Sequence, residues 1–408
     1  METLERYFER KHAELQLINE SLREPIAFDV VQSIDEVVKL KFKLTAALRA
    51  ENERSAWSAT ETSWSHGAKS SGPFRFDYDY QRADLNVQGP NFYKIPGLKI
   101  SELLYTGSGM AAISAVLLAL SRIFREVSIF ALPGSYSETI EFLKNYGPKL
   151  QLHLSQDWCA ARPGPRVLLL DSCVPSATFF AALRENAPAI DLIVFDTTCF
   201  AGTSGRIRRA LCWAHRRKVP VVMVRSHTKL DSMGAEYGRL GSLAFVADET
   251  VRESADFVNE MKTAIRLFGG AALPAHFPPY VGSEQFRRLT RSRIFATLRN
   301  NRLAASVLKT AFGSALDHWS GLYVTLTGSF DENGARQIVQ RMSDDLRRKG
   351  LPIRHAGSFG FDFAATEWSR NSVTGRYAVR IALSDFPETI NRRLIDEIET
   401  WWRRNELR

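Results

Sequence analysis

A lysine follows a buried strand and two hydroxyl residues near the middle of the chain. The apolar run from 219 to 224 predicts a buried strand, and Ser226, Thr228 and Lys229 follow it. Partial burial lowers the pKa of a lysine and makes a neutral, nucleophilic amine available. Hydroxyl groups beside it can donate hydrogen bonds to an anion. The stretch suits a lysine that forms a Schiff base with a phosphate-bearing aldehyde such as pyridoxal phosphate, or a lysine that extends from a strand end to solvent.

A glycine-rich turn ahead of a helix is a second candidate for binding an anion. Gly107, Ser108 and Gly109 precede Met110 and a run of small and apolar residues that predicts a strong helix. The free N–H groups and the dipole at a helix N-terminus both favour phosphate. Ordinary helix capping by Ser108 is the alternative, because the spacing matches neither a dinucleotide-binding fingerprint nor a P-loop.

Acidic and aromatic residues stand at further strand ends. Asp196 lies near the end of the buried strand predicted at 191–198. An aspartate there can cap a helix, or it can hold a pyridinium N–H so that the ring acts as an electron sink. Tyr136 lies in a strand-to-helix turn, where α/β sheets bind ligands, although it could also be a surface tyrosine. Tyr80 and Arg82 belong to a stretch that favours an edge strand, and their phenol and guanidinium could also grip a phosphate.

The elements around these residues predict an α/β fold. Strands at 166–171, 191–198 and 219–224 alternate with helices at 177–185 and 208–215, which predicts a mostly parallel sheet. Other predicted elements are helices at 1–55, 137–145, 249–268, 286–312, 332–349 and 387–404, strands at 127–132, 242–246, 322–330, 353–361 and 377–383, and a loop at 57–75. We expect an N-terminal helical segment and loop at 1–75, a large α/β domain at 76–268, and a linker helix with a small C-terminal α+β domain at 269–408.

Composition narrows the class of protein. The chain has 408 residues, 45% of them hydrophobic, which suits one large enzyme subunit. The net charge of +9 is spread along the chain and predicts a solvated surface rather than a nucleic-acid interface. Four cysteines without a CxxC pair predict buried thiols in a reducing compartment and no metal site. No signal peptide or membrane-spanning run is visible, so we expect a cytoplasmic protein.

The ordered motifs resemble those of the fold-type I pyridoxal phosphate enzymes. Within that class they are similar to the cysteine/methionine-metabolism group, which contains cystathionine lyases and synthases and methionine γ-lyase. The resemblance covers roughly residues 76–400. Residues 226–229 are similar to the group's Ser-x-Thr-Lys, which implies Lys229 as the Schiff-base lysine and Ser226 and Thr228 as phosphate ligands. Residues 108–112 are similar to its Ser-Gly-Met-Ala-Ala phosphate turn.

Further motifs imply further roles. Tyr136 begins a stretch similar to Tyr-Gly-Gly-Thr, which implies that it stacks on the pyridine ring. Residues 196–198 are similar to Asp-Asn-Thr, which implies Asp196 on the ring nitrogen and Thr198 beside the cofactor. Residues 80–82 resemble the Tyr-x-Arg that a neighbouring subunit contributes to the phosphate, which implies a homodimer or homotetramer. Ser358 and Arg380 lie in stretches similar to Ser-Leu-Gly and Arg-Leu-Ser-Val-Gly, which implies substrate binding, with Arg380 on the α-carboxylate.

Three departures from the group leave the reaction open. The group's Glu-x-Pro-x-Asn-Pro is replaced by residues 171–176, without the asparagine. Glu138 replaces a glycine and could face the substrate side chain. Arg239 begins Arg-Leu-Gly, which looks more like the phosphate-binding Arg-x-Gly of aminotransferases.

The resemblance implies β/γ-elimination or γ-replacement on an amino acid with a side-chain leaving group, through a quinonoid intermediate. Lys229 would be the general base, Asp196 would keep the ring protonated, and Tyr136 would be the acid/base near the leaving group. An aminotransferase is the alternative, and a non-catalytic protein of this fold is a third possibility.

Overall fold

The structure is a computed structural model. It describes residues 2–61, 70–78, 85–93, 100–147, 149–154, 164–184, 190–237, 239–246, 254–313, 316–318, 321–371 and 375–405, with backbone alone at 55–61, 254 and 317–318. The chain forms two compact units. Unit 1 contains Met1–Glu51, Lys229–Tyr237 and Pro279–Arg408, and unit 2 contains Asn52–Thr228 and Gly238–Pro278. These bounds differ from the predicted domains, because the first 51 residues group with the C-terminal part of the chain.

Unit 2 is built on a mostly parallel sheet. Its seven strands lie in the order β4 (Glu102–Thr106), β10 (Gly241–Val246), β9 (Val221–Ser226), β8 (Leu192–Asp196), β7 (Arg166–Asp171), β5 (Val127–Ala131) and β6 (Leu150–His153). The five strands from β9 to β6 are parallel, whereas β10 runs antiparallel to both β9 and β4. The predicted mostly parallel sheet is confirmed, and it brings the carboxyl ends of β7, β8 and β9 to one edge.

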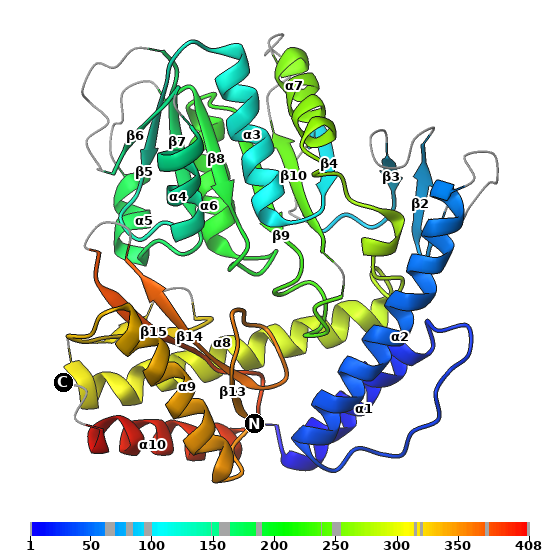
Figure 1. Ribbon diagram of the computed structural model, residues 1–408, viewed down its shortest axis with the longest axis vertical. Helices are drawn as coiled ribbons and strands as arrows, with labels where there is room; N and C mark the ends of the chain where they lie inside the picture. Colours follow the sequence, from blue (N-terminus) through cyan, green and yellow to red (C-terminus); the bar gives the residue numbers. More distant parts are fainter. Residues whose placement is uncertain are drawn as a thin grey trace. The chain divides into compact units, whose positions relative to one another are not determined.

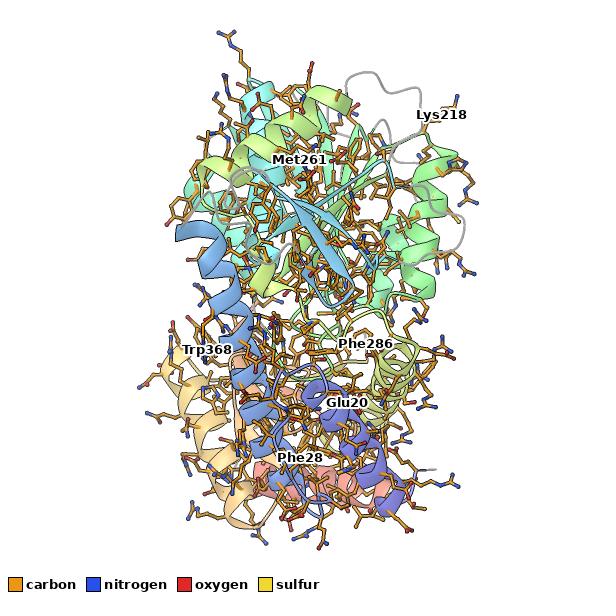
Figure 2. All side chains as sticks on the ribbon, turned by 90° about the vertical axis from the view of Figure 1, so that its right-hand side faces the viewer. Glu20, Phe28, Lys218, Met261, Phe286 and Trp368 are labelled. Atoms are coloured by element: carbon orange, nitrogen blue, oxygen red, sulfur yellow. The ribbon has the colours of Figure 1, made fainter. Side chains whose placement is uncertain are left out.

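Helices cover both faces of this sheet (Figure 1). Apolar residues of α3 (Gly109–Ile123), α4 (Ser137–Tyr146) and α7 (Ser254–Leu267) pack on one face, and those of α5 (Ser176–Ala182) and α6 (Gly205–Arg216) on the other. Neighbouring strand residues alternate between the two cores, as with Val194 and Ile193. Met261 of α7 is fully buried in the first core (Figure 2). The strands are apolar throughout because both faces are buried.

A small antiparallel sheet of β1 (Ser70–Ser71), β2 (Phe74–Asp77) and β3 (Asn86–Gln88) also belongs to unit 2. Phe74 and Phe76 pack on Phe277, which follows the short 3-10 helix η1 (Pro274–His276). The hydroxyl of Ser71 donates to the carbonyl of Phe277 over 2.7 Å. The loop predicted at 57–75 is therefore partly wrong, because these strands begin within it.

Unit 1 contains a second sheet, covered by helices on one face. Its five strands lie in the order β11 (Leu316–His318), β12 (Val324–Thr327), β15 (Tyr377–Ala382), β14 (Ala364–Arg370) and β13 (Ile353–His355). Apolar residues of α8 (Glu284–Phe312), α9 (Glu332–Arg348) and α10 (Glu388–Arg404) share one core with this sheet. Val379 and Ile381 of β15 face that core, so Arg380 between them points to the opposite face.

Residues of two N-terminal helices, up to Glu51, complete unit 1. Tyr7 of α1 (Leu4–Asn19) is fully buried in the core that α8, α9 and α10 form with the sheet. The second helix, α2 (Ile34–Glu61), is longer than predicted. The predicted strand at 353–361 ends at His355, and β14 begins only at Ala364. A glycine with φ of +97° at Gly360 lies between them, a conformation that an extended strand does not contain.

Candidate functional site

In unit 2, the glycine-rich turn before α3 packs directly against the end of β9. Ser108 caps α3, accepting a hydrogen bond of 3.0 Å from the N–H of Ala111. A Cβ added at Gly109 would lie 2.9 Å from Cβ of Ser226, so only glycine fits there without a shift. The N–H groups of Gly109 and Met110, in the first turn of α3, have no acceptor within a helix. The turn therefore offers hydrogen-bond donors and a favourable dipole to an anion beside Ser226.

Four of the residues predicted to bind a cofactor are joined by hydrogen bonds. The N–H of Thr198 donates to Oδ1 of Asp196 over 2.7 Å, and the hydroxyl of Thr198 also bonds this carboxylate. Oγ1 of Thr198 accepts from the N–H of Ser226 over 2.9 Å, and the hydroxyls of Ser226 and Thr228 lie 3.0 Å apart. We call these four residues the Thr198 series. It joins the carboxylate at the end of β8 to the hydroxyls at the end of β9.

Asp196 is a buried acid at the carboxyl end of β8. Burial raises the pKa of Asp196, against the opposing effects of the hydrogen bonds from Thr198 and the positive charge of Arg225. A carboxylate in this position is stabilised by a further N–H donor, since desolvation is what disfavours its charge. The site can therefore hold a protonated ring nitrogen.

A second buried acid, Asp171, stands beside Asp196 in the register of β7 and β8. Its Oδ2 accepts a hydrogen bond of 2.7 Å from the N–H of Tyr136, and its Oδ1 accepts one of 2.7 Å from the N–H of Cys173. Burial, then Cys173 and then Asp196 raise the pKa of Asp171 well above its ordinary value. Asp171 thus fixes the backbone of Tyr136 at the start of α4. The sequence predicted a strand that ends at residue 171, but the contact of this acid with residue 136 depends on the fold.

Between Ser226 and Thr228 lies a buried histidine, His227, for which the sequence predicted no role. His227 is 3% exposed, and its Nε2 lies 2.7 Å from the hydroxyl of Ser242 on β10. The ring of Phe92 lies 4.1 Å from the imidazole, centroid to centroid. The hydroxyl of Tyr93 bonds the same Ser242 over 2.8 Å. His227 therefore anchors the segment between Ser226 and Thr228 to the neighbouring strand.

Lys229 directly follows Thr228 in the chain and is described within unit 1. Its Nζ donates a short hydrogen bond to the hydroxyl of Ser358 and lies 5.4 Å from the ring centroid of Phe359. The structure thus brings together two residues that were predicted separately, the lysine and the serine. This hydrogen bond to the hydroxyl of Ser358 restricts where Nζ can lie.

Two aromatic rings connect this lysine to Arg380. The ring centroids of Phe359 and Tyr323 lie 5.7 Å apart, and the guanidinium carbon of Arg380 lies 4.5 Å from the ring of Tyr323. Arg380 also pairs with Glu367 on β14, with 3.2 Å between Nη1 and Oε2. The sheet register places these two residues opposite each other on β15 and β14. A substrate carboxylate at Arg380 would therefore compete with Glu367.

Other predicted residues are not brought into these groups. Glu138 is exposed in the first turn of α4, and the side chain of Arg239 is exposed. Tyr80 and Arg82 lie outside the described residues. The roles predicted for these residues stay predictions.

The burial of the cysteines differs in part from the expectation of four buried thiols. Cys212 is exposed on α6, so the expectation of four buried thiols is wrong for it. Cys173 is only partly buried and Cys199 is buried; their sulfurs lie 3.9 Å apart, and Cys159 lies outside the described residues. In the described ranges no group of three or more His, Cys, Asp or Glu side chains could hold a metal ion. None of the described helices combines the length and the apolar character needed to cross a membrane.

Comparison with known proteins shows the fold. No protein-family model and no curated protein matches this sequence. A solved structure described as SPT with a PLP internal aldimine matches with a TM-score of 0.51 at 12% identity, covering 76% of this chain and 74% of that one. The serine palmitoyltransferase of Sphingomonas wittichii matches with a TM-score of 0.51 at 14% identity, covering 77% and 74%.

A third match is metB from Corynebacterium glutamicum, with a TM-score of 0.51 at 12% identity over 74% of this chain and 81% of that one. The predicted fold class is therefore confirmed: the chain has the PLP-transferase fold type I, with a mostly parallel seven-stranded sheet in its larger unit. At these identities the similarity concerns the fold alone.

Proposed function

We propose that this protein is an enzyme that binds pyridoxal phosphate through Lys229 and acts on an amino acid with a side-chain leaving group. The observation that carries this proposal is the Thr198 series. It joins a buried carboxylate to two hydroxyls beside the N-terminus of α3, and Lys229 is the next residue in the chain. A charge-stabilising acid, a phosphate-binding turn and an amine are the three groups that this cofactor requires.

The residues present fit the cofactor in type and position. The N–H groups of Gly109 and Met110, with the hydroxyls of Ser226 and Thr228, would bind its phosphate. The carboxylate of Asp196 would accept the ring N–H, which compensates its burial. Tyr136, half-buried at the start of α4, would pack on the ring.

Pyridoxal phosphate, when bound, supplies an electron sink that stabilises negative charge on Cα of an amino acid. In this proposal, Nζ of Lys229 takes the proton from Cα and returns it later, while the hydroxyl of Ser358 restricts where Nζ lies. The carboxylate of Asp196 holds the proton on the ring nitrogen. The hydroxyl of Tyr136 donates a proton to the departing group. The guanidinium of Arg380 binds the α-carboxylate of the substrate after separating from Glu367.

The resemblance to the cysteine/methionine-metabolism group places β/γ-elimination or γ-replacement first among the reactions. The fold leaves the reaction class open, because a serine palmitoyltransferase and metB both share it. The aminotransferase alternative came from Arg239, whose side chain is exposed in this structure. No contact among the described residues favours that alternative.

Absorption spectroscopy tests the proposal. Wild-type protein and the Lys229→Ala variant are titrated with pyridoxal phosphate, and amino acids are then added without a keto acid. A visible Schiff-base band in the wild type alone supports the cofactor site. Release of ammonia and a keto acid supports elimination, whereas conversion to the pyridoxamine form supports an aminotransferase. Absence of any band in the wild type would refute the proposal.

We also propose a homodimer or homotetramer, since Tyr80 and Arg82 resemble residues that a neighbouring subunit contributes. Mixing the Lys229→Ala and Arg82→Ala variants tests this. Subunit exchange should restore activity, because a mixed dimer contains one site with both residues intact. Two inactive variants that stay inactive after proven exchange would contradict a shared site.

A further inference from the structure

A cluster of charged side chains lies buried in unit 1, where the sequence predicted a solvated surface for charge. In the described part of the unit we define the buried charge cluster as Arg10, Lys11, Glu14, Lys41, Arg293, Asp362 and Asp385. Lys11, Glu14 and Asp385 are fully buried, with no exposed surface. Nζ of Lys11 lies 2.6 Å from Asp362 and 2.7 Å from Asp385.

The charges of this cluster compensate one another. Burial alone would raise the pKa of Asp362, but the positive charges of Arg293, Lys11 and Lys41 hold it below its ordinary value. The pKa of Asp385 is likewise held well below its ordinary value, mainly by Arg293 and Lys11 against burial. Removing one partner from a buried pair leaves a charge without compensation, which is strongly unfavourable. Substitution of a single charged residue in the cluster is therefore expected to be destabilising.

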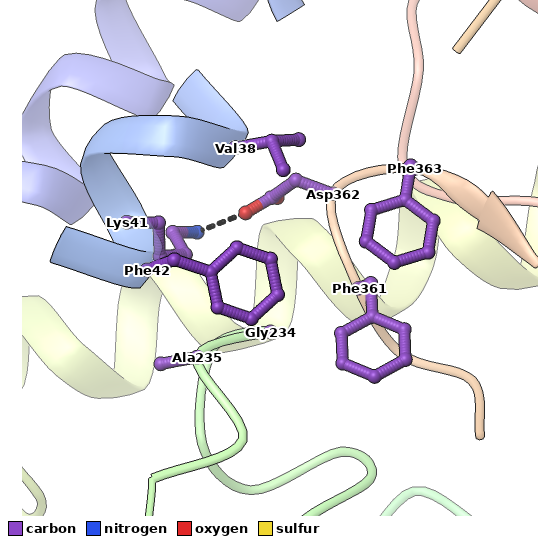
Figure 3. A pocket seen from close by; sticks show the side chains of 8 residues that line it. All are labelled: Val38, Lys41, Phe42, Gly234, Ala235, Phe361, Asp362 and Phe363. Carbon is purple, nitrogen blue, oxygen red and sulfur yellow. Dashed lines mark ion pairs between the residues drawn. The ribbon is translucent and has the colours of Figure 1, made fainter. Parts of the chain in front are cut away.

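Two cations of the cluster also bind the backbone of two loops. Nζ of Lys41 donates to the carbonyl of Met233 over 2.9 Å, in the loop that begins with Lys229. Nη2 of Arg293 donates to the carbonyl of Gly360 over 2.7 Å, in the loop that carries Ser358. Lys41 also pairs with Asp362 over 2.6 Å (Figure 3). The cluster thus connects α2 and α8 to both loops.

The two loops contact each other closely where the cluster holds them. A Cβ added at Gly360 would overlap the carbonyl of Lys229. A Cβ added at Gly234 would lie 2.7 Å from the guanidinium carbon of Arg293 and 2.9 Å from the carbonyl of Gly360. The gap lined by Lys41, Phe42 and Phe361 has room for about one water molecule (Figure 3). Displacement of either loop would therefore disturb the other.

The loop after Lys229 has an unfavourable backbone. Met233, Gly234 and Glu236 have φ values of 53°, 75° and 45°. Residues other than glycine occupy this left-handed region at a cost and remain there when the surroundings determine them. The hydrogen bond from Lys41 to Met233 is one such restraint. Without it, the loop should relax to other conformations.

We propose that Lys41 and Arg293 are positioning residues for Lys229: through the carbonyls of Met233 and Gly360, the buried charge cluster holds loop 229–237 against loop 358–362. This arrangement keeps Nζ of Lys229 at Ser358. Through Lys41, α2 therefore helps to position Lys229. The inference deepens the proposed function and rests on it where Lys229 is taken as the reactive lysine.

Hydrogen–deuterium exchange of the cofactor-free protein tests the restraint itself. In Lys41→Met, amides of 229–237 and 358–362 should exchange at least about ten-fold faster, while those of α3 keep the wild-type rate. Lys41→Arg, which retains a cation, should restore slow exchange. Lys43→Met is the matched control, because Lys43 is exposed on the same helix. Unchanged exchange in both loops of Lys41→Met would overturn the inference.

The apparent affinity for pyridoxal phosphate is the second readout. The concentration that gives half of the Schiff-base band should rise at least about five-fold in Lys41→Met, since fewer molecules hold the lysine in place. Lys41→Arg should recover it. If amides of the two loops exchange faster in Lys41→Met but the half-saturating concentration of pyridoxal phosphate is unchanged, the positioning role of Lys41 would be contradicted. If the wild type binds no pyridoxal phosphate, the proposed function fails, and the exchange result still decides the loop restraint.

If Lys41→Met does not fold, a second variant tests the inference. The double variant Lys41→Met/Glu14→Gln removes one charge of each sign. It therefore leaves no buried carboxylate at residue 14 that has lost its partner Lys41. It should fold and show the same faster exchange in the two loops. A folded double variant with wild-type exchange would overturn the inference equally.

Discussion

Oγ1 of Thr198 accepts a hydrogen bond of 2.9 Å from the backbone N–H of Ser226. This bond fixes the loop after β8 to the end of β9, where the predicted phosphate-binding hydroxyls lie. The same threonine bonds the carboxylate of Asp196. One side chain thereby sets the position of the proposed ring-binding acid relative to the proposed phosphate site.

Thr198→Val removes this link with little change in side-chain volume. The N–H of Ser226 loses its acceptor, so we expect a loss of about 1–3 kcal/mol in the free energy of unfolding. Affinity for pyridoxal phosphate should fall as well, measured by absorbance titration. Thr198→Ser keeps the hydroxyl and should behave like the wild type. A valine variant with unchanged affinity would show that the link does not position the site.

Asp196→Asn tests the role of the buried carboxylate. The amide can still accept the N–H of Thr198, but it cannot balance a protonated ring nitrogen. We expect turnover to fall by about a hundred-fold or more, with the protein still folded, as judged by circular dichroism. Asp196→Glu, which keeps a carboxylate, should retain more activity. Equal activity in the asparagine variant would remove Asp196 from the mechanism.

Asp171 should make stability depend on pH in a defined direction. Its folded-state pKa is raised well above the unfolded value, so its contribution to stability is complete below the unfolded pKa. This contribution is lost as pH rises through the folded pKa. The unfolding free energy of wild type relative to Asp171→Asn should therefore decrease with rising pH above about 4, measured by denaturant titration. A difference that increases with pH would contradict the raised pKa.

Glu367→Gln should release Arg380 for a substrate carboxylate. The pair is partly exposed, with side chains 17% and 26% accessible, so its own contribution to stability is small. We expect KM for a carboxylate substrate to fall by about two- to five-fold, with kcat little changed. Arg380→Lys, which loses the bidentate fork, should raise KM instead. A higher KM in Glu367→Gln would show that Glu367 orients Arg380 rather than competing for it.

The local elements of this fold were largely predictable from sequence, whereas the contacts between them were not. Apolar runs such as 166–171 identified the parallel strands because such strands are buried on both faces. β14 was missed because it has few apolar residues: Glu367 and Ser369 alternate with Thr366 and Trp368, and Thr366 is polar although it is buried. Motif spacing selected Ser226, Thr228 and Asp196, but the bridging position of Thr198 depends on strand order.

The burial of charged residues is the main feature that the sequence did not predict. Lys11, Glu14 and Lys41 lie on helices whose charged residues were expected to face solvent. Asp362 and Asp385, which pair with Lys11, stand more than 300 residues away along the chain. No periodicity within one helix reveals such a partner, because the compensation of a buried charge is a tertiary property.

The most direct test of this account is reduction of the protein with borohydride in the presence of pyridoxal phosphate, followed by peptide mapping. We expect a reduced adduct on Lys229 in the wild type and less of it at this position in Thr198→Val at a limiting cofactor concentration. An adduct spread over other lysines, with Lys229 unmodified in the wild type, would contradict it.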